Sequence, residues 1–454
     1  MLNEQKGKLG LRDCSAILIG GMIGSAIFSL SGVTIAGAGP AAILSWIIAA
    51  IILFFYGMQT AELSTIYPKS GGIFVFPEKA LGKTEKQGKF WGWIAAWSYL
   101  FGCIGGAAFS VYYIGYYMGQ GFPALAGATT IISVIAAVVC GLLILLNISA
   151  TGKVNFGLTV GLAATMVIFI VVAFGSGNWN AANFSPFIGQ GAGGSLGFVS
   201  AIPIAMLAYG AIVAVAFMVD EIKNPRKTIP KSMVIGMTVT VILYVMMIVA
   251  TLGLVTAQFL AENPNFTYAP MVGAAISGLM ATPWIMTVIV IAAVLALITT
   301  VLVVMLLAAR TFQAAAGGGL LPKGLAKVGK NGTPINATIL TIIIVVIFAA
   351  LPDVTNLVVN LGALSNVLVV AIISITVVAA RRKNPNVEGK FKAPGGSAVS
   401  VIVLIVLIIC YIPDFMNGSW MLWVWSACYY AVALIIFAAT IGRSKDPALL
   451  KARA

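Results

Sequence analysis

Histidine is absent from this chain of 454 residues. Without imidazole the chain lacks the side chain that most often carries protons near neutral pH, and it can form neither a Ser–His pair nor the HExxH zinc motif. A GxxxxGK[ST] run, which would bind nucleotide phosphates, is missing too. No filter sequence or ring of charges typical of an ion-selective pore is visible. We therefore expect neither an enzyme, nor a nucleotide-driven pump, nor a channel.

Charged residues are scarce, at 8% of the chain, whereas hydrophobic residues make up 61%. A soluble domain of this length needs more charge to cover its surface. Uncharged stretches of 48 residues between Asp13 and Glu62, and of 63 residues between Lys89 and Lys153, separate the charges. Because about 20 apolar residues cross the hydrocarbon as a helix, each stretch is long enough for two or three spans. We predict an all-α integral membrane protein.

The cysteines do not form a recognisable metal site or disulfide framework. Their number is odd, and their spacings within apolar segments match no metal motif, so we expect reduced packing residues: Cys14, Cys103, Cys140, Cys410 and Cys428. The first twelve residues are polar and show no small-residue cleavage pattern. A cleavable signal peptide is therefore not expected.

Apolar runs interrupted by Pro, Gly and charge predict twelve membrane-spanning helices. Their approximate limits are 14–37, 40–64, 91–118, 124–147, 153–174, 197–219, 231–255, 284–312, 334–351, 354–380, 397–413 and 419–441. With this count all 26 Lys and Arg fall on one side, and the loops of the other side carry only Glu262, Asp353 and Asp414. Positive charge favours the inner side. We predict a multi-pass protein of the cell membrane with both termini cytoplasmic.

Two of the predicted helices carry interruptions near their middle. The first contains residues 20–26 (GGMIGSA), and the sixth contains residues 208–211 (AYGA) after Pro203. Glycine costs a helix about 1 kcal/mol relative to alanine, and irregular backbone within a membrane persists where it lines a cavity or meets a ligand. The interruptions hold corresponding positions in two halves, 14–174 and 197–380, as in transporters with a midplane site. Close helix packing is the alternative for any single glycine.

Such a pair of interruptions suits a zwitterionic ligand. A half-helix that begins after a break offers free amides and a positive dipole end to a carboxylate. A half-helix that ends before a break offers carbonyls to an ammonium group. The sequence therefore predicts that backbone groups hold a small zwitterion without any charged side chain.

Five motifs occur in a characteristic order along the chain: GSAIF at 24–28; AEL at 61–63 with PKSGG at 68–72; AYG at 208–210; EIKNP at 221–225 with IP at 229–230; and GLLP at 319–322 with GTP at 332–334. Together they resemble the amino acid–polyamine–organocation superfamily of amino acid permeases, over essentially the whole chain. The resemblance implies the inverted 5+5 repeat shared with sodium-coupled leucine transporters, with discontinuous helices 1 and 6. Its expected parts are a cytoplasmic segment 1–13, repeats 14–174 and 197–380, helices 11 and 12 in 397–441, and a cytoplasmic tail 442–454.

The resemblance also implies which residues bind the substrate. The carboxylate would meet amides around Ser25–Ile27, and the ammonium group would meet carbonyls near Gly21–Ile23 and Leu207–Tyr209. The expected set is Gly21, Ile23, Gly24, Ser25, Ala26, Ile27, Cys103, Leu207, Ala208, Tyr209 and Gly210; residues 103–107, Val303, Val304, Ser365 and Asn366 are further candidates for side-chain specificity. Tyr209 or a neighbouring aromatic would close over the ligand. A bond from the Ser25 hydroxyl back to its own helix is the alternative for that residue.

Departures from the family pattern narrow the substrate. Val213 stands where the family often has a glutamate in helix 6, which argues against a second cation on the substrate and favours neutral amino acids over arginine or polyamines. Leu162 stands where many relatives carry a lysine within helix 5. Ala26 replaces the usual glycine and narrows the room beside the carboxylate.

The coupling mode stays open at this stage. Thr299 and Thr300 match the hydroxyl pair of the sodium-coupled branch, and with the carbonyls of Gly20 and Ile23 they would form a sodium site. Bonds from the two threonines to the preceding turn are the alternative. Amino acid exchange, proton coupling, and a transporter-like subunit or sensor are the other possibilities.

A pair of opposite charges is expected across the inner mouth. Glu221 or Asp220 would pair with Arg310 or Lys223 and form a gate, and an ordinary interfacial ion pair is the alternative. In the outer loop that follows helix 7, residues 269–279 are expected to form a short helix over the bundle.

Overall fold

The structure, a computed structural model, describes residues 9–68, 71–146, 152–279, 284–329, 332–351, 355–385, 391–416 and 420–441. Most of the predicted terminal segments, 1–8 and 442–454, lie outside these residues. The described residues are helical almost throughout, which confirms the all-α fold, and the single β-bridge among them joins Leu9 to Ile222.

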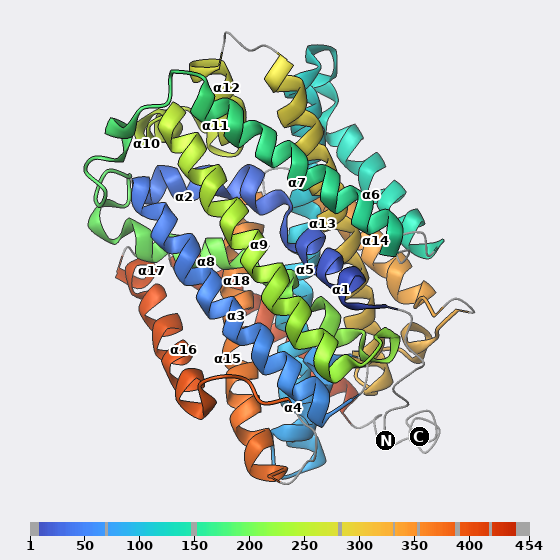
Figure 1. Ribbon diagram of the computed structural model, residues 1–454. Helices are drawn as coiled ribbons and strands as arrows, with labels where there is room; N and C mark the ends of the chain where they lie inside the picture. Colours follow the sequence, from blue (N-terminus) through green and yellow to red (C-terminus); the bar gives the residue numbers. More distant parts are fainter. Residues whose placement is uncertain are drawn as a thin grey trace.

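The α-helices follow one another along the chain as shown in Figure 1. They are α1 (Leu11–Met22), α2 (Ser31–Ala38), α3 (Ala42–Ile66), α4 (Gly72–Ala80), α5 (Glu85–Gly121), α6 (Thr129–Leu145), α7 (Gly152–Gly175), α8 (Gly197–Leu207), α9 (Pro225–Leu254), α10 (Ala257–Glu262), α11 (Pro264–Thr267), α12 (Pro270–Gly278), α13 (Trp284–Gly317), α14 (Ile335–Ala349), α15 (Thr355–Lys383), α16 (Gly396–Cys410), α17 (Ile412–Met416) and α18 (Trp420–Thr440). A π-helix η1 (Ala26–Leu30) and 3₁₀ helices η7 (Gly210–Phe217) and η8 (Val219–Glu221) lie between them, and further 3₁₀ turns are Gly39–Ala41, Pro123–Ala128, Ala181–Phe184, Gly194–Leu196 and Lys323–Ala326.

Many of these helices have the length and composition of membrane spans. Nine helical stretches within the described residues are long and apolar enough to cross a membrane, and the first of them, Leu11–Ile66, contains α1 to α3. Helices α14 and α16 are equally apolar but shorter. Large aliphatic side chains point outward, for example Ile131, Ile408 and Ile435 at 65–70% exposure. A surface of this kind is suited to lipid rather than to water.

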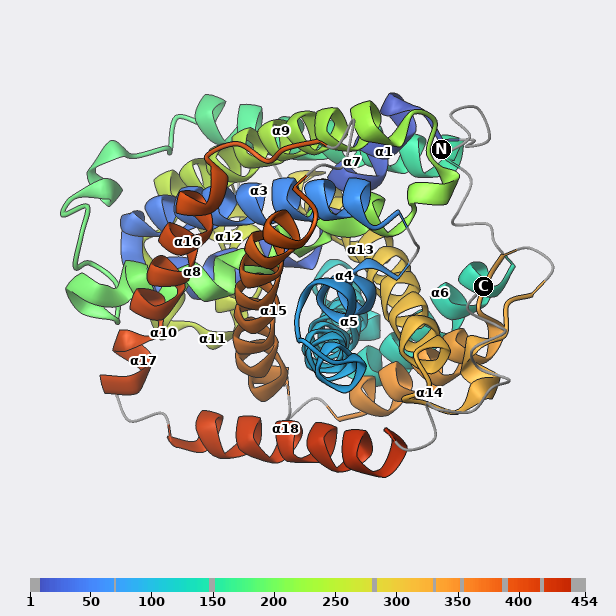
Figure 2. The ribbon, with the colours of Figure 1, turned by 90° about the horizontal axis from the view of Figure 1, so that it is seen from below.

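Helix α5 is the central element of the bundle. It packs against α13 on one side and α15 on another, and Figure 2 shows it end-on between these two helices. Helices α1, α3 and α9 form a neighbouring group. In Figure 1, α4 and the ends of α3 and α15 lie at one end of the molecule, whereas α10, α11 and α12 lie at the other. We call these the α4 end and the α12 end.

The interruption predicted in the first apolar helix is present. Helix α1 ends at Met22, and Ile23 adopts an extended conformation with φ −72° and ψ 99°. The chain then resumes as the π-helix η1 and continues into α2. Because an extended residue breaks the i→i−4 ladder, the carbonyls at the end of α1 lose their helical partners at this point.

The interruption predicted in the second half is also present. Helix α8 ends at Leu207, and Tyr209 leaves the helical region at φ −107° and ψ 2° before η7 begins. The end of η8, which follows η7, is tied to the segment that precedes α1, since Leu9 N–H donates to Glu221 O and Lys223 N–H donates to Leu9 O, both at 2.9 Å. The two interrupted elements are thus connected at the α4 end.

The loop after α9 is helical. The expected short helix over 269–279 is found as α12, and two further turns, α10 and α11, precede it. Helix α4 was not expected from the sequence. It follows Gly71, whose φ of 96° lies in the left-handed region that glycine tolerates.

Candidate functional site

A cavity lies between the two interruptions and the helices that face them. Its volume is about 100 Å³, a few times the roughly 30 Å³ that one water molecule occupies in the liquid. Elements α1, η1, α5, α8, η7, α13 and α15 contribute to its wall. The site can therefore hold a small molecule surrounded by backbone from both interruptions.

Most of the expected substrate-binding residues lie on this cavity. Those that line it are Gly21, Ser25, Ala26, Cys103, Leu207, Ala208 and Gly210, together with the specificity candidates Gly105, Gly106, Val304 and Asn366. Ile23, Gly24, Ile27 and Tyr209 do not line it, and neither does the candidate Val303 or Ser365. The Ser25 hydroxyl makes no hydrogen bond to a described residue, so a bond back to its own helix is not seen.

The Tyr209 side chain differs from the expectation. Its ring is fully buried behind the interruptions, against Trp46 at 6.1 Å and Tyr244 at 5.3 Å between ring centroids. Aromatic rings that do reach the cavity are those of Tyr99 and Phe109, both from α5. The tyrosine is therefore placed to support the break rather than to close over a ligand.

Several lining residues were not singled out from the sequence. They are Leu30, Ser98, Tyr99, Gly102, Phe109, Ala211, Leu307, Val358, Val359 and Gly362, besides Met22, which lies in the range 21–23 expected to meet the ammonium group, and Thr300, which was assigned to sodium. Their spacing on α5 gives a usable signal, because Ser98, Gly102, Gly105, Gly106 and Phe109 recur at three- and four-residue intervals and so share one helix face. On α15 the lining residues Val358, Gly362 and Asn366 recur at four-residue intervals in the same way.

Gly24 lies against Thr300 of α13. A Cβ added at Gly24 would lie 1.5 Å from Thr300 Oγ1 and 2.7 Å from Thr300 Cβ. A side-chain hydroxyl can rotate away, but Cβ is fixed by the backbone of α13. The absence of a side chain at Gly24 is thus what allows the interrupted helix to approach α13 this closely.

Besides the Ser25 hydroxyl, two fully buried polar atoms on the cavity wall have no partner within the described part of the chain. They are the Thr300 hydroxyl of α13 and the Asn366 side-chain amide nitrogen of α15. A buried polar group left unsatisfied costs about 1–3 kcal/mol, and such groups are rare in native proteins unless water or a ligand completes them. Both groups therefore point to a polar ligand or ordered water in the cavity.

Tyr244 of α9 connects the two interruptions, and this was not foreseen. Its hydroxyl donates to Met22 O, at the end of α1, and lies 3.5 Å from Ala208 O, at the end of α8. The ring is fully buried and packs edge-on against Trp46 at 5.0 Å. The Tyr244 hydroxyl thus bonds to carbonyls that the sequence assigned to a ligand's ammonium group. Met22 O already accepts a hydrogen bond from it.

The expected sodium ligands lie on facing elements. Thr299 Oγ1 donates to Ala296 O at 2.9 Å, which is the bond to the preceding turn that the sequence gave as the alternative. Thr300 makes no such bond among the described residues. Leu162 is fully buried on α7.

At the α4 end one expected ion pair is present. Arg310 of α13 donates to Glu221 Oε1 of η8 at 2.8 Å. This pair joins the element that follows the second interruption to α13. The Asp220 side chain lies outside the described residues, and Lys223 contributes its backbone N–H to the contact with Leu9.

At the α12 end aromatic rings cover the cavity. Phe109 lines the cavity and packs against Tyr113 at 4.5 Å, and Tyr113 stacks on Tyr268 of the loop between α11 and α12 at 5.6 Å. Tyr116 donates to Asn265 O at 2.5 Å, in the same loop region. The chain between α10 and α12 is thereby fixed to α5 at this end of the cavity.

Comparison with known proteins agrees with this geometry. A family described as amino acid permease matches residues 9–439. The branched-chain amino acid permease BcaP of Bacillus subtilis is 28% identical over 95% of this chain and 92% of its own. The serine/threonine exchanger SteT of the same organism is 27% identical over 63% of this chain and 65% of its own. BcaP of Lactococcus lactis is 27% identical over 76% of each chain. The chain belongs to the amino acid permease family of the amino acid–polyamine–organocation superfamily, and it is a multi-pass membrane transporter rather than an enzyme.

Proposed function

We propose that this protein is a secondary transporter that carries a small neutral amino acid across the cell membrane by alternating access. The observation that carries the proposal is the cavity between two interrupted helices, whose backbone groups suit a carboxylate and an ammonium group. None of the described lining residues is Asp, Glu, Lys or Arg. A net-neutral zwitterion fits such a wall better than a substrate with an additional charge.

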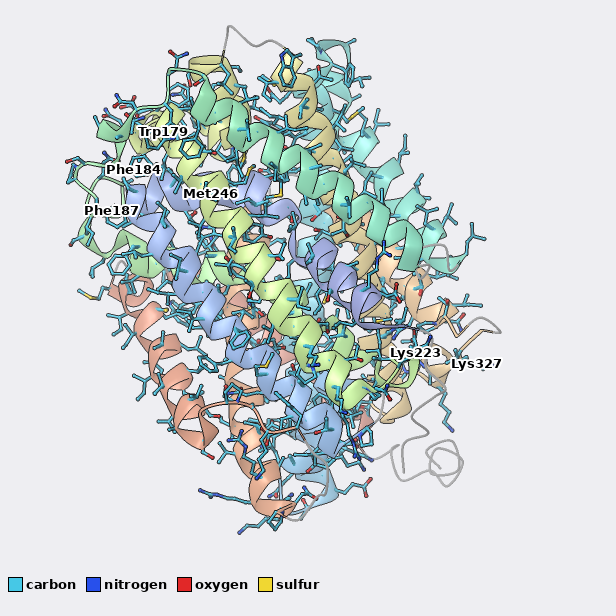
Figure 3. The ribbon with its side chains drawn as sticks, in the orientation of Figure 1. Trp179, Phe184, Phe187, Lys223, Met246 and Lys327 are labelled. Atoms are coloured by element: carbon cyan, nitrogen blue, oxygen red, sulfur yellow. The ribbon has the colours of Figure 1, made fainter. Side chains whose placement is uncertain are left out.

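The proposed membrane topology has twelve spans, arranged as two inverted repeats of five followed by two more. Support comes from the interruptions in α1–α2 and α8–η7, which hold the first position of each repeat, and from the apolar helices α14 and α16, which complete the count. Both termini are proposed to be cytoplasmic. Figure 3 is consistent with this orientation, since Lys223 and Lys327 lie at the end opposite Trp179, Phe184 and Phe187.

Asn366 favours a substrate whose side chain accepts a hydrogen bond. Its unpaired amide shares the wall with the aliphatic residues Val304, Leu307 and Val358. Threonine offers both a hydroxyl and a methyl group, so we propose threonine and serine ahead of leucine and isoleucine. A site built to hydrogen-bond a hydroxyl discriminates strongly against an analogue without it.

Uptake by the purified protein in liposomes tests this proposal. Labelled threonine should accumulate, unlabelled serine should compete better than leucine, and arginine should not compete. Asn366→Leu should reverse the preference between threonine and valine, which have nearly the same shape. Absence of uptake with any of the twenty amino acids would favour the alternative of a sensor or of a subunit that requires a partner chain. Unchanged selectivity in Asn366→Leu would remove this residue from the site.

Replacing Tyr244 with Phe should reduce uptake without unfolding the protein. The change removes only the hydroxyl, and it leaves buried carbonyls at the ends of α1 and α8 without their donor. A cost of about 1–3 kcal/mol to the backbone geometry that binds the ligand corresponds to roughly a fivefold to 150-fold loss of threonine binding. A scintillation proximity assay with labelled threonine measures this loss of affinity. Tyr56→Phe is the matched control, because the buried Tyr56 hydroxyl has no partner among the described residues; an equal loss in both variants would contradict the bridging role.

Sodium coupling is the further mode that we propose to test. Thr300 presents an unpaired hydroxyl beside the break of α1, where the carbonyls of Gly20 and Ile23 would complete an oxygen site. If sodium is bound there, uptake should rise with a sodium gradient, and Thr299→Val with Thr300→Val should abolish this dependence. Uptake that is independent of sodium in the wild type, yet stimulated by amino acid inside the liposome, would establish exchange instead.

Alternating access requires contacts that break when the cavity opens. The Arg310–Glu221 pair at the α4 end and the Tyr113–Tyr268 stack at the α12 end are contacts on the two sides of the cavity. We propose that α1, α3, η7, η8 and α9 move as a group against α5 and α13. Opening toward the α4 end would then separate Arg310 from Glu221, which lie on the two groups.

A further inference from the structure

A second hollow lies on the outside of the molecule, between α3, α9 and the residues that precede α16. Its volume is about 510 Å³, within the range of roughly 300–1,000 Å³ typical of small-molecule sites. It shares no lining residue with the substrate cavity. Phe54 and Met58 of α3 and Val234 and Ile235 of α9 form its apolar wall, and the last two remain 45% and 41% exposed.

The segment of residues 391–394, which closes this groove, is held in place by hydrogen bonds to α3. Ala393 N–H donates to Glu62 Oε2 at 2.7 Å, and Phe391 N–H donates to Thr65 Oγ1 at 3.2 Å. Both acceptors belong to α3, which also supplies one wall. Figure 2 shows the stretch that leads into α16 running along α9 and α3. Because two backbone hydrogen bonds hold this stretch on α3, Lys392 has a defined position at the groove.

Two cations border the apolar wall. Lys231 and Lys392 are exposed lining residues of the groove, and neither pairs with an acidic residue within the described part of the chain. The described lining contains no Asp or Glu. Lysines beside apolar surface attract lipids with anionic head groups. A ligand that complements both features has an anionic head and a hydrocarbon chain.

We propose that this groove is a binding site for one anionic phospholipid of the surrounding bilayer. Its phosphate lies between Lys231 and Lys392, and an acyl chain covers Phe54, Val234 and Ile235. A free phosphate would leave the apolar wall uncovered, and a zwitterionic phospholipid would leave the excess positive charge unneutralised. Since α3 and α9 belong to the group proposed to move during transport, the bound lipid would accompany that group.

Native mass spectrometry of the purified protein titrated with phosphatidylglycerol tests the site, and phosphatidylcholine with the same chains is the comparison lipid. The wild type should retain one phosphatidylglycerol in preference to phosphatidylcholine. Lys231→Gln with Lys392→Gln should weaken phosphatidylglycerol binding by on the order of tenfold and abolish the preference. Lys223→Gln with Lys327→Gln is the matched control, because both lysines are exposed at the same end but outside the groove.

A third variant tests the hydrocarbon part. Val234→Trp fills the groove and keeps both lysines, so it should also lose the bound phosphatidylglycerol. Equal loss in the control pair would show attraction by overall charge and overturn the proposal, as would equal retention of the two lipids by the wild type. Retention by Val234→Trp would overturn the assignment of the acyl chain. The measurement does not depend on transport, so its outcome is separate from that of the proposed function.

Discussion

Gly24→Leu is expected to abolish uptake. A Cβ at this position would lie 1.5 Å from Thr300 Oγ1 and 2.7 Å from Thr300 Cβ, so any side chain forces α1 and η1 away from α13. The displaced segment is the one that contributes Gly21, Ser25 and Ala26 to the cavity. Because the proposed binding of a carboxylate depends on backbone amides held in place, a shift of this segment removes the site rather than merely reshaping it.

Graded variants distinguish this steric effect from general misfolding. Gly24→Ala carries the smallest side chain and should already lower uptake severely, whereas Gly37→Ala should leave it unchanged, because a Cβ at Gly37 would meet no heavy atom within 4 Å. Thr300→Gly removes both atoms that clash, and combined with Gly24→Ala it should restore part of threonine binding. Uptake at the wild-type rate in Gly24→Leu would mean that transport never requires α1 to lie against α13.

Some of this site could be predicted from the sequence because its signals are local. Three glycines within five residues at 20–24 indicate a weak helix, and α1 does end at Met22. The same holds for residues 208–211, where α8 gives way to η7. The backbone groups that the interruptions expose are consequences of these short segments alone, and they can be recognised without knowing what packs around them.

The remainder depends on residues that are distant in the chain. Tyr244 bonds to an oxygen 222 residues earlier, and no pattern around Tyr244 distinguishes it from other aromatic residues of membrane helices. The side chain of Tyr209 illustrates the same dependence: its position at the break suggested the cavity, whereas its buried ring packs against Trp46 and Tyr244. Contacts with residues distant in the sequence determine the positions of both side chains.

Glu62→Ala should destabilise the protein far more than Glu221→Ala, although each change breaks one arginine–carboxylate pair. Glu62 is fully buried and accepts from Arg381 Nε at 2.8 Å, from an Arg381 terminal nitrogen at 2.7 Å and from Ala393 N–H at 2.7 Å. Removing one partner of a buried pair costs about 3–5 kcal/mol. The Glu221 side chain is 45% exposed, and such a surface pair is worth about 0.2–1 kcal/mol.

Thermal unfolding in detergent, followed by fluorescence-detected size exclusion, measures the difference. We expect a large fall in melting temperature for Glu62→Ala and a small one for Glu221→Ala. Glu62→Met combined with Arg381→Met should recover much of the loss, because apolar residues of similar size can replace a buried pair at little net cost. Equal shifts in melting temperature in the two alanine variants would show that burial does not determine how much each ion pair contributes to stability.

The two ion pairs also connect different parts of the fold, so the two variants should differ in their effect on transport as well as on stability. Glu62 joins α3 to α15 and to the segment before α16, which is also a wall of the lipid groove, whereas Glu221 joins η8 to α13. If Arg310–Glu221 opens in each transport cycle, Glu221→Ala should change the rate of uptake with little change in stability. Glu62 is too strongly bound to Arg381 to separate from it at every turnover, so we expect α3 and α15 to stay together at this end of the molecule. Glu62→Gln keeps the shape of the side chain but not its charge. This variant should therefore lower the stability of the protein before it changes the affinity for substrate.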